Sequence, residues 1–160
     1  MPEGNRKDRI RQLARMKSHL MQLEALMGRV VHRDELLSLK QTVLVKQQLS
    51  KFTVCPIVSR EIPFDDRKAG RFSHFIQQLG LANSSSVYVW IHHGFDCGLL
   101  LASSLDVVDV LNFPFEPPNE VVSFITSDLR DRLLFDSTTE PETRTLTIEV
   151  QGDHWLDVNY

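Results

Sequence analysis

The sequence predicts an α+β fold, in which N-terminal helices precede a mainly antiparallel sheet with one or two packed helices. Three observations support this. The first 51 residues are rich in helix formers, the remainder contains several short β-prone runs, and turn residues separate those runs closely enough for hairpins. A length of 160 residues fits one domain, so we expect a basic helical segment (1–51) and an acidic α+β domain (52–160) to form one compact unit.

The N-terminal segment is predicted to contain two helices. Residues 6–27 lack Gly and Pro and are dominated by Leu, Met, Arg and Lys, which favour helices. Asp34 is a suitable N-cap for a second helix, which would give a helical hairpin or one bent helix. The apolar residues of the first helix recur at spacings of 4, 3 and 4, as in a helix-packing seam: Met16, Leu20, Leu23 and Met27.

The chain then changes to β-prone composition. Residues 52–58 favour an extended backbone, but Pro56 restricts them to an edge strand or a linker. Asp65 or Asp66 is expected to cap a third helix that ends before Gly80.

Two neighbouring strands are predicted next. Residues 87–91 form the strongest strand pattern, residues 92–98 form a turn, and residues 99–102 return beside the first strand. A short helix is expected over residues 104–111.

The C-terminal part is predicted to be mostly strand. Residues 120–126 read as a buried strand, whereas residues 128–136 fit a helix or a strand equally well. Residues 144–150 alternate between apolar and polar, and residues 137–143 would join them to the preceding strand as a hairpin. Residues 154–159 are expected to add a last strand.

The charged residues are unevenly distributed along the sequence, although the net charge is only −3. Residues 1–51 carry 11 Lys and Arg against 5 acids, and residues 52–160 carry 7 bases against 16 acids. The basic segment lies against the acidic domain of the same chain or of a symmetry mate, or one of the two attracts a partner of opposite charge, and both can hold together. We expect the acidic surface to dock a basic protein. Its candidate residues are Asp96, Asp106, Asp109, Glu116, Glu120, Asp128, Asp131 and Asp136.

Three classes of function follow. In size, charge and lack of catalytic motifs the chain resembles immunity proteins that neutralise nuclease toxins, and a chaperone for a secreted effector would share these features. The alternative is a structural or regulatory protein that oligomerises through the seam of the first helix. The third is an enzyme built around residues 92–98. We expect a non-enzymatic binding protein.

The turn at residues 92–98 is the main candidate for chemistry. His92, His93, Asp96 and Cys97 bring two imidazoles, a carboxylate and a thiol close together in the sequence. On a strand the two imidazoles would point to opposite faces, and the other His and Cys residues are scattered, whereas zinc needs about four ligands. We therefore expect no metal and no cofactor, and a structural rather than nucleophilic Cys97.

Other classes are excluded or disfavoured by composition. No apolar run is long enough to cross a bilayer or to serve as a signal peptide, and two cysteines are too few for a disulfide framework, so we expect a cytoplasmic protein. The N-terminal bases lack neighbouring aromatic residues that would stack on bases, so nucleic acid is not the expected ligand. The Phe- and Pro-rich residues 113–118 form either a rigid contact or a loop tucked into the core.

Overall fold

The computed structural model describes residues 3–139 and 142–160 and has the predicted α+β fold. Its helices and strands are, in chain order, α1 (Glu3–Met27), α2 (Leu39–Gln48), β1 (Val58–Pro63), α3 (Gly70–Ala82), β2 (Val87–Trp90), α4 (Gly94–Cys97), β3 (Leu100–Ala102), β4 (Val121–Thr126), β5 (Asp131–Thr139) and β6 (Arg144–Gly152). Four short 3-10 segments lie between them, namely η1 (Arg33–Glu35), η2 (Leu49–Val54), η3 (Phe64–Lys68) and η4 (Leu105–Val107).

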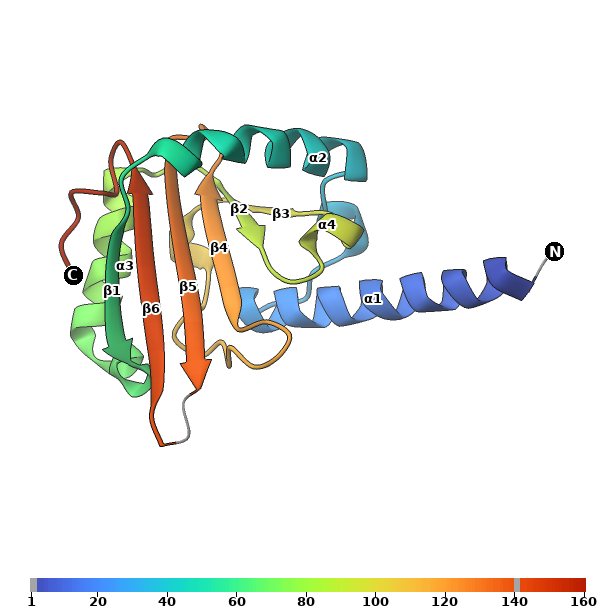
Figure 1. Cartoon of the computed structure of the whole chain (residues 1–160), viewed down its shortest axis with the longest axis horizontal. Helices are drawn as coiled ribbons and strands as arrows, with labels where there is room; N and C mark the ends of the chain where they lie inside the picture. The colour runs from blue at the N-terminus through green and yellow to red at the C-terminus, as the bar shows by residue number, and fades with distance from the viewer. Residues whose placement is uncertain (1–2, 140–141) are drawn as a thin grey trace.

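One antiparallel sheet organises the molecule. Its strand order is β1-β6-β5-β4-β2-β3, and every neighbouring pair is antiparallel. Figure 1 shows α3 behind the sheet and α2 crossing its upper end. We call the sheet side turned away from α3 the outer face.

The hydrophobic core lies between the sheet and α3. Phe72, Phe75 and Leu79 of α3 are almost fully buried, because the apolar residues of this helix share one side. Trp155, which follows β6, is also buried and donates its indole N–H to the carbonyl oxygen of Leu79 at 2.8 Å. Leu23 in the second half of α1 joins the same core, so this half of the helix is packed onto the acidic part of the chain.

The two N-terminal helices do not form the expected hairpin. α1 ends at Met27, where Gly28 takes a φ of 64°, and α2 begins only at Leu39. Its N-cap is Ser38 rather than Asp34: the Ser38 hydroxyl accepts the Gln41 N–H at 3.1 Å. In Figure 1, α1 and α2 lie on different sides of the unit formed by β2, β3 and α4.

Two expected elements are absent from the described residues. Residues 104–111 contain only the short η4, and the chain beyond it does not continue as a helix, because Val108 and Val110 are both buried in the core. Residues 154–159 form turns instead of a last strand, because their first backbone N–H groups bind the carboxylate of Asp131.

The structure answers three further questions about local structure that the sequence analysis left open or answered wrongly. Residues 131–139 are a strand, and the part of the expected 137–143 hairpin loop at 140–141 lies outside the described residues. Gly80 lies inside α3, packed against Asp106, instead of following the helix. Phe113 and Phe115 are buried, so the Pro-rich loop is tucked into the core.

Candidate functional site

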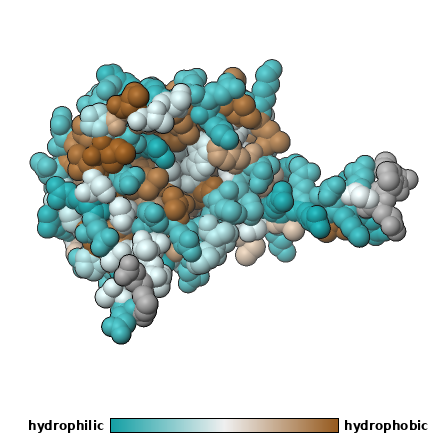
Figure 2. All heavy atoms as spheres, viewed as in Figure 1, coloured by the Kyte–Doolittle hydropathy of each residue, from teal (hydrophilic) through white to brown (hydrophobic). Residues whose placement is uncertain are grey.

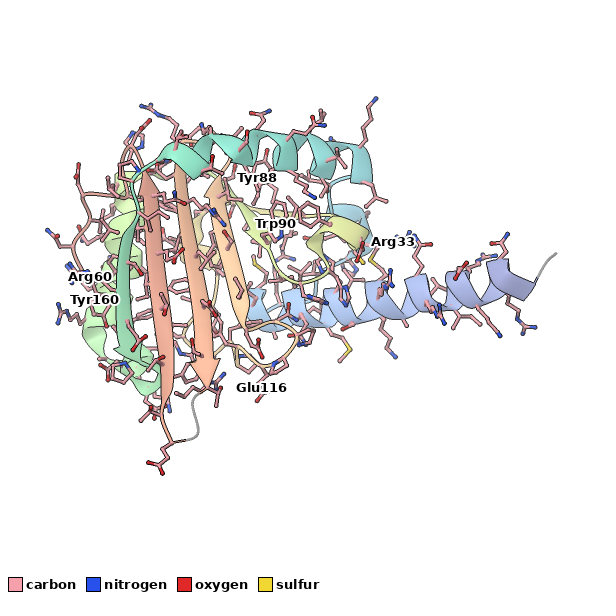
Figure 3. The ribbon with its side chains drawn as sticks, viewed as in Figure 1. Arg33, Arg60, Tyr88, Trp90, Glu116 and Tyr160 are labelled. Atoms are coloured by element: carbon pink, nitrogen blue, oxygen red, sulfur yellow. The ribbon has the colours of Figure 1, made fainter. Side chains whose placement is uncertain are left out.

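The carboxylates expected to form one docking surface lie in separate regions. Glu120 and Asp128 lie beyond opposite ends of β4, whose 6 residues span about 20 Å. Asp106 packs beside Gly80 of α3, and Asp96 belongs to α4. Figure 3 shows Glu116 below the sheet, far from α4. These residues therefore do not form a single patch.

Asp131 has no exposed surface and is unavailable to a partner, contrary to the sequence-based expectation. Its carboxylate accepts hydrogen bonds from Asn83 Nδ2 at 2.7 Å, from the backbone N–H of His154 at 2.7 Å and from that of Trp155 at 2.9 Å. It also lies 2.8 Å from Nδ1 of His154. The side chain thus fixes the C-terminal turn to the start of β5.

Two other acids of this set are held by their own chain. Asp109 accepts hydrogen bonds from the backbone and side-chain N–H groups of Asn112. For Asp128, burial would raise the pKa, but hydrogen bonds, among them those from the Arg130 N–H and Asn83 Nδ2, outweigh it and lower the pKa. Both carboxylates organise local turns.

The seam of α1 is used mainly within the chain. Leu23 is fully buried and Met27 is 8% exposed, both in the core, whereas Met16 and Leu20 are half-buried. Little of this surface is left for oligomerisation.

The turn at residues 92–98 contains the short helix α4. Because β2 ends at Trp90, His92 and His93 are not on a strand, and their rings pack edge to face with centroids 4.4 Å apart, not on opposite sides as expected. Burial raises the pKa of the Cys97 thiol, and Asp96 raises it further, so the thiolate form of a nucleophile is disfavoured. Among the described residues, no group of three His, Cys, Asp or Glu side chains is placed to hold a metal ion.

The outer face of the sheet carries a different set of residues, which the strand register defines. Opposed residues of an antiparallel pair point to the same side. One row across the strands therefore holds Ser59, Glu149, Leu134, Ser123 and Trp90. The next row holds Glu61, Thr147, Asp136 and Val121. Apolar side chains on β2, β4 and β5 thus adjoin carboxylates on β1, β5 and β6.

Part of this face is covered and part is open. At its upper end η2 lies on the sheet, where Gln151 Nε2 donates to the carbonyl oxygen of Phe52 at 2.7 Å. Below η2 lies a hollow of about 270 Å³, which is lined by Leu49, Trp90, Val121, Ser123, Ile125, Arg132 and Leu134. Figure 2 shows apolar surface (brown) over the sheet among polar residues (teal), and Figure 3 shows Tyr88 and Trp90 on β2 near α2 and α4.

Arg132 is the basic residue of this hollow. Its Nε lies 3.4 Å from Ser123 Oγ, a weak contact. Burial lowers the pKa of Arg132, while the nearby Glu149 opposes that shift. The guanidinium stays charged but is incompletely solvated, so a carboxylate or carbonyl oxygen of a bound partner would be well placed to bind it.

The surroundings of Trp90 are fixed by aromatic and cationic contacts. The Trp90 ring packs edge to face on Phe95, with centroids 4.2 Å apart, and Lys46 Nζ lies 4.0 Å from the centre of the Phe95 ring. Phe95 is 36% exposed and Val121 is 45% exposed. The apolar rim of the hollow therefore continues onto α4 and β4.

No protein-family model, curated protein or solved structure matches this chain. The helices of the described residues also include none that combines the length and apolar character needed to cross a bilayer.

Of the three carboxylates on the outer face, sequence reasoning found Asp136 but missed Glu61 and Glu149, and it also missed the apolar half of this face. A signal was present, since residues 87–91 are apolar or aromatic at successive positions and residues 121–125 are apolar except for Ser123, which places apolar side chains on both faces of a strand. The sequence did not show that one of these faces would remain partly uncovered.

Proposed function

We propose that this chain is a binding protein whose outer face takes a basic, amphipathic helix of a partner protein. The observation that carries the proposal is the open apolar hollow around Trp90 and Leu134, bordered by the carboxylates of Glu61, Asp136 and Glu149. We call these three the face acids.

The chemistry of the face favours such a partner. Apolar side chains of a docked helix would be removed from water against Trp90, Val121 and Leu134. Lys or Arg residues on the flanks of that helix would approach the face acids, which speeds association and fixes orientation more than it adds affinity. The three face acids outnumber the two bases described around the hollow, Arg132 and Lys46, so the face keeps the expected preference for a basic partner.

This proposal is more specific than the expectation from the sequence that an acidic surface docks a basic protein. An immunity protein fits it, because a nuclease surface that binds nucleic acid is rich in Lys and Arg. A chaperone that holds an amphipathic effector segment on the same face fits it as well. The partner is expected to contact the outer face and not the acids dispersed around the rest of the molecule.

Trp90 offers a direct test, because it is half-exposed on the outer face whereas Trp155 is fully buried. The probes are a synthetic amphipathic helical peptide of Leu, Lys and Arg, and a matched peptide with Glu in place of the bases. The basic peptide should shift Trp90 emission to the blue and protect it from acrylamide. The signal should weaken at high salt and vanish in Trp90→Phe. An equal response to the acidic peptide, or none to the basic one, would contradict the proposal.

Charge-reversal variants test whether the basic peptide binds at the outer face. Asp136→Lys with Glu149→Lys should weaken binding of the basic peptide by about tenfold or more. The matched control is Asp106→Lys with Asp157→Lys, two exposed acids on the α3 side, which should bind as the unmodified chain does. If both double variants lose the same affinity for the basic peptide, the net charge of the chain determines binding, and not the outer face.

A further inference from the structure

We propose that the N-terminal part of α1 docks on the outer face of a second copy of this chain. This inference rests on the function proposed above and names one occupant of that face. We call residues 4–15 of α1 the arm.

The arm is exposed to solvent along its length. All residues from 4 to 15 are exposed, and burial begins with Met16 and His19. Figure 1 shows this end of α1 projecting away from the sheet. On its inner side an open hollow of about 330 Å³, lined partly by Asp8, Arg15 and Asp96, separates it from α4. Isolated helices of this length are marginal in water, so a contact that covers the arm would stabilise it.

An exposed apolar stripe begins in the arm and continues along α1 to Met21. Successive helical residues are about 100° apart around the axis, so Ile10, Leu13 and Met21 lie within about 80° of one another. They point about 160° away from the side of α1 that buries His19 and Leu23. Ile10, Leu13 and Met21 are 57%, 56% and 57% exposed. α1 therefore packs one side on its own core and presents a second apolar side to an external surface.

The charge of the arm complements the outer face. The arm holds five bases against one acid, Asp8. The outer face has the three face acids against Arg132 in the hollow and Lys46 on its rim, next to apolar side chains. A twelve-residue helix is about 18 Å long, and five strands from β1 to β2 span about 19 Å, so the dimensions match.

The arm cannot reach the outer face of its own copy. α1 is one unbroken helix, and its second half is fixed in the core through Leu23 and Leu26. In Figure 1 its direction carries the arm away from the sheet. The face that it fits therefore belongs to another copy, and reciprocal exchange of two arms would close a dimer. Direct pairing of two arms is disfavoured, because it would bring like charges together.

The test is the mass of the full chain in solution, by sedimentation equilibrium at low and high salt. We expect a dimer that dissociates as salt rises. Leu134→Lys on the face, and Ile10→Asn with Leu13→Asn on the arm, should each raise the dissociation constant at least about tenfold. The matched control is Leu81→Asn, which replaces a 71% exposed leucine of α3 and should dimerise like the unmodified chain. A chain that stays monomeric at high micromolar concentration overturns the inference.

A mixing experiment separates arm exchange from other kinds of dimer. The arm variant and the face variant, each monomeric alone, should form a heterodimer when mixed, because one intact arm then meets one intact face. Dimerisation that survives the face variant would show arm-to-arm pairing and overturn the inference. If the chain is monomeric but the basic peptide still binds at Trp90, the inference fails and the proposed function stands. If the peptide does not bind either, both fail.

Discussion

His19 of α1 is joined to Gly98, the residue that follows α4, by a hydrogen bond of 2.9 Å between Nε2 and the carbonyl oxygen. Because a carbonyl only accepts, Nε2 carries a proton and donates it in this hydrogen bond. The side chain has no exposed surface, and its Nδ1 has no hydrogen-bond partner among the described residues. This contact connects the buried part of α1 to the loop before β3.

A loss of stability at mildly acidic pH follows from this geometry. Burial lowers the pKa of His19, the Gly98 hydrogen bond opposes this, and the charge of nearby His93 lowers it further. The unfolded chain therefore binds a proton more readily than the folded one, and stability is full above pH about 6.5 and falls below it. We expect the free energy of unfolding, measured by urea titration, to fall by up to about 1.4 kcal/mol per pH unit for this residue.

The variant His19→Gln separates this effect from general acid sensitivity. It should reduce the dependence of stability on pH between 7 and 5, with some dependence remaining, because burial also lowers the pKa of His93. The matched control is His74→Gln, on the exposed side of α3, which should keep the slope of the unmodified chain. If the pH dependence of the unfolding free energy is unchanged in His19→Gln, this histidine is not the source of that dependence.

Gly98 is expected to tolerate no side chain. Its φ of 103° is rarely adopted by other residues, and a Cβ would collide with the carbonyl oxygen of Leu37. Gly98→Ala should lower the unfolding free energy by about 2 kcal/mol or more. Gly4→Ala, in an exposed turn of α1 with nothing near its Cβ, should be neutral or slightly stabilising. Equal stability of the two variants in urea would refute this.

Replacing Asp131 should destabilise the fold far more than replacing Asp136 in the same strand. Asp131→Ala removes the acceptor of the His154 and Trp155 backbone N–H groups and leaves Asn83 Nδ2 with only its longer hydrogen bond to Asp128. We expect a loss of about 3 kcal/mol or more. Asp136→Ala, on the half-exposed outer face, should cost under about 0.5 kcal/mol. Similar urea midpoints for both would contradict the assigned roles.

Arg67 is predicted to hold the Pro-rich loop in place. Its Nη1 donates to the carbonyl oxygens of Val110 at 2.8 Å and Phe113 at 2.7 Å, and burial lowers its pKa to about 10. Arg67→Met should lower the unfolding free energy by about 2–3 kcal/mol, because both carbonyls lose a charged donor. The control is Arg71→Met, whose exposed guanidinium contacts the C-terminal Tyr160, with an expected loss below about 1 kcal/mol. Thermal unfolding of both variants provides the measurement.

Local patterns determined most of the elements. Gly- and Pro-free composition predicted α1, and clean alternation predicted β6, because these preferences act within a few residues. The residues around Asp34 and at 104–111 were misassigned, because Ser38 offers the better N-cap and because Val108 and Val110 are pulled into the core. The first is a choice between two local capping signals, whereas at residues 104–111 tertiary burial outweighed local propensity.

For the candidate site, the sequence by itself determined the charge division and the apolar strands, since both are properties of composition and short-range order. Only the tertiary structure decided that Asp131 is internal, that the remaining acids point in different directions, and that Trp90 and Leu134 meet on a partly open face. Which carboxylates share a surface depends on strand order and register, which arise from contacts between residues distant in the chain.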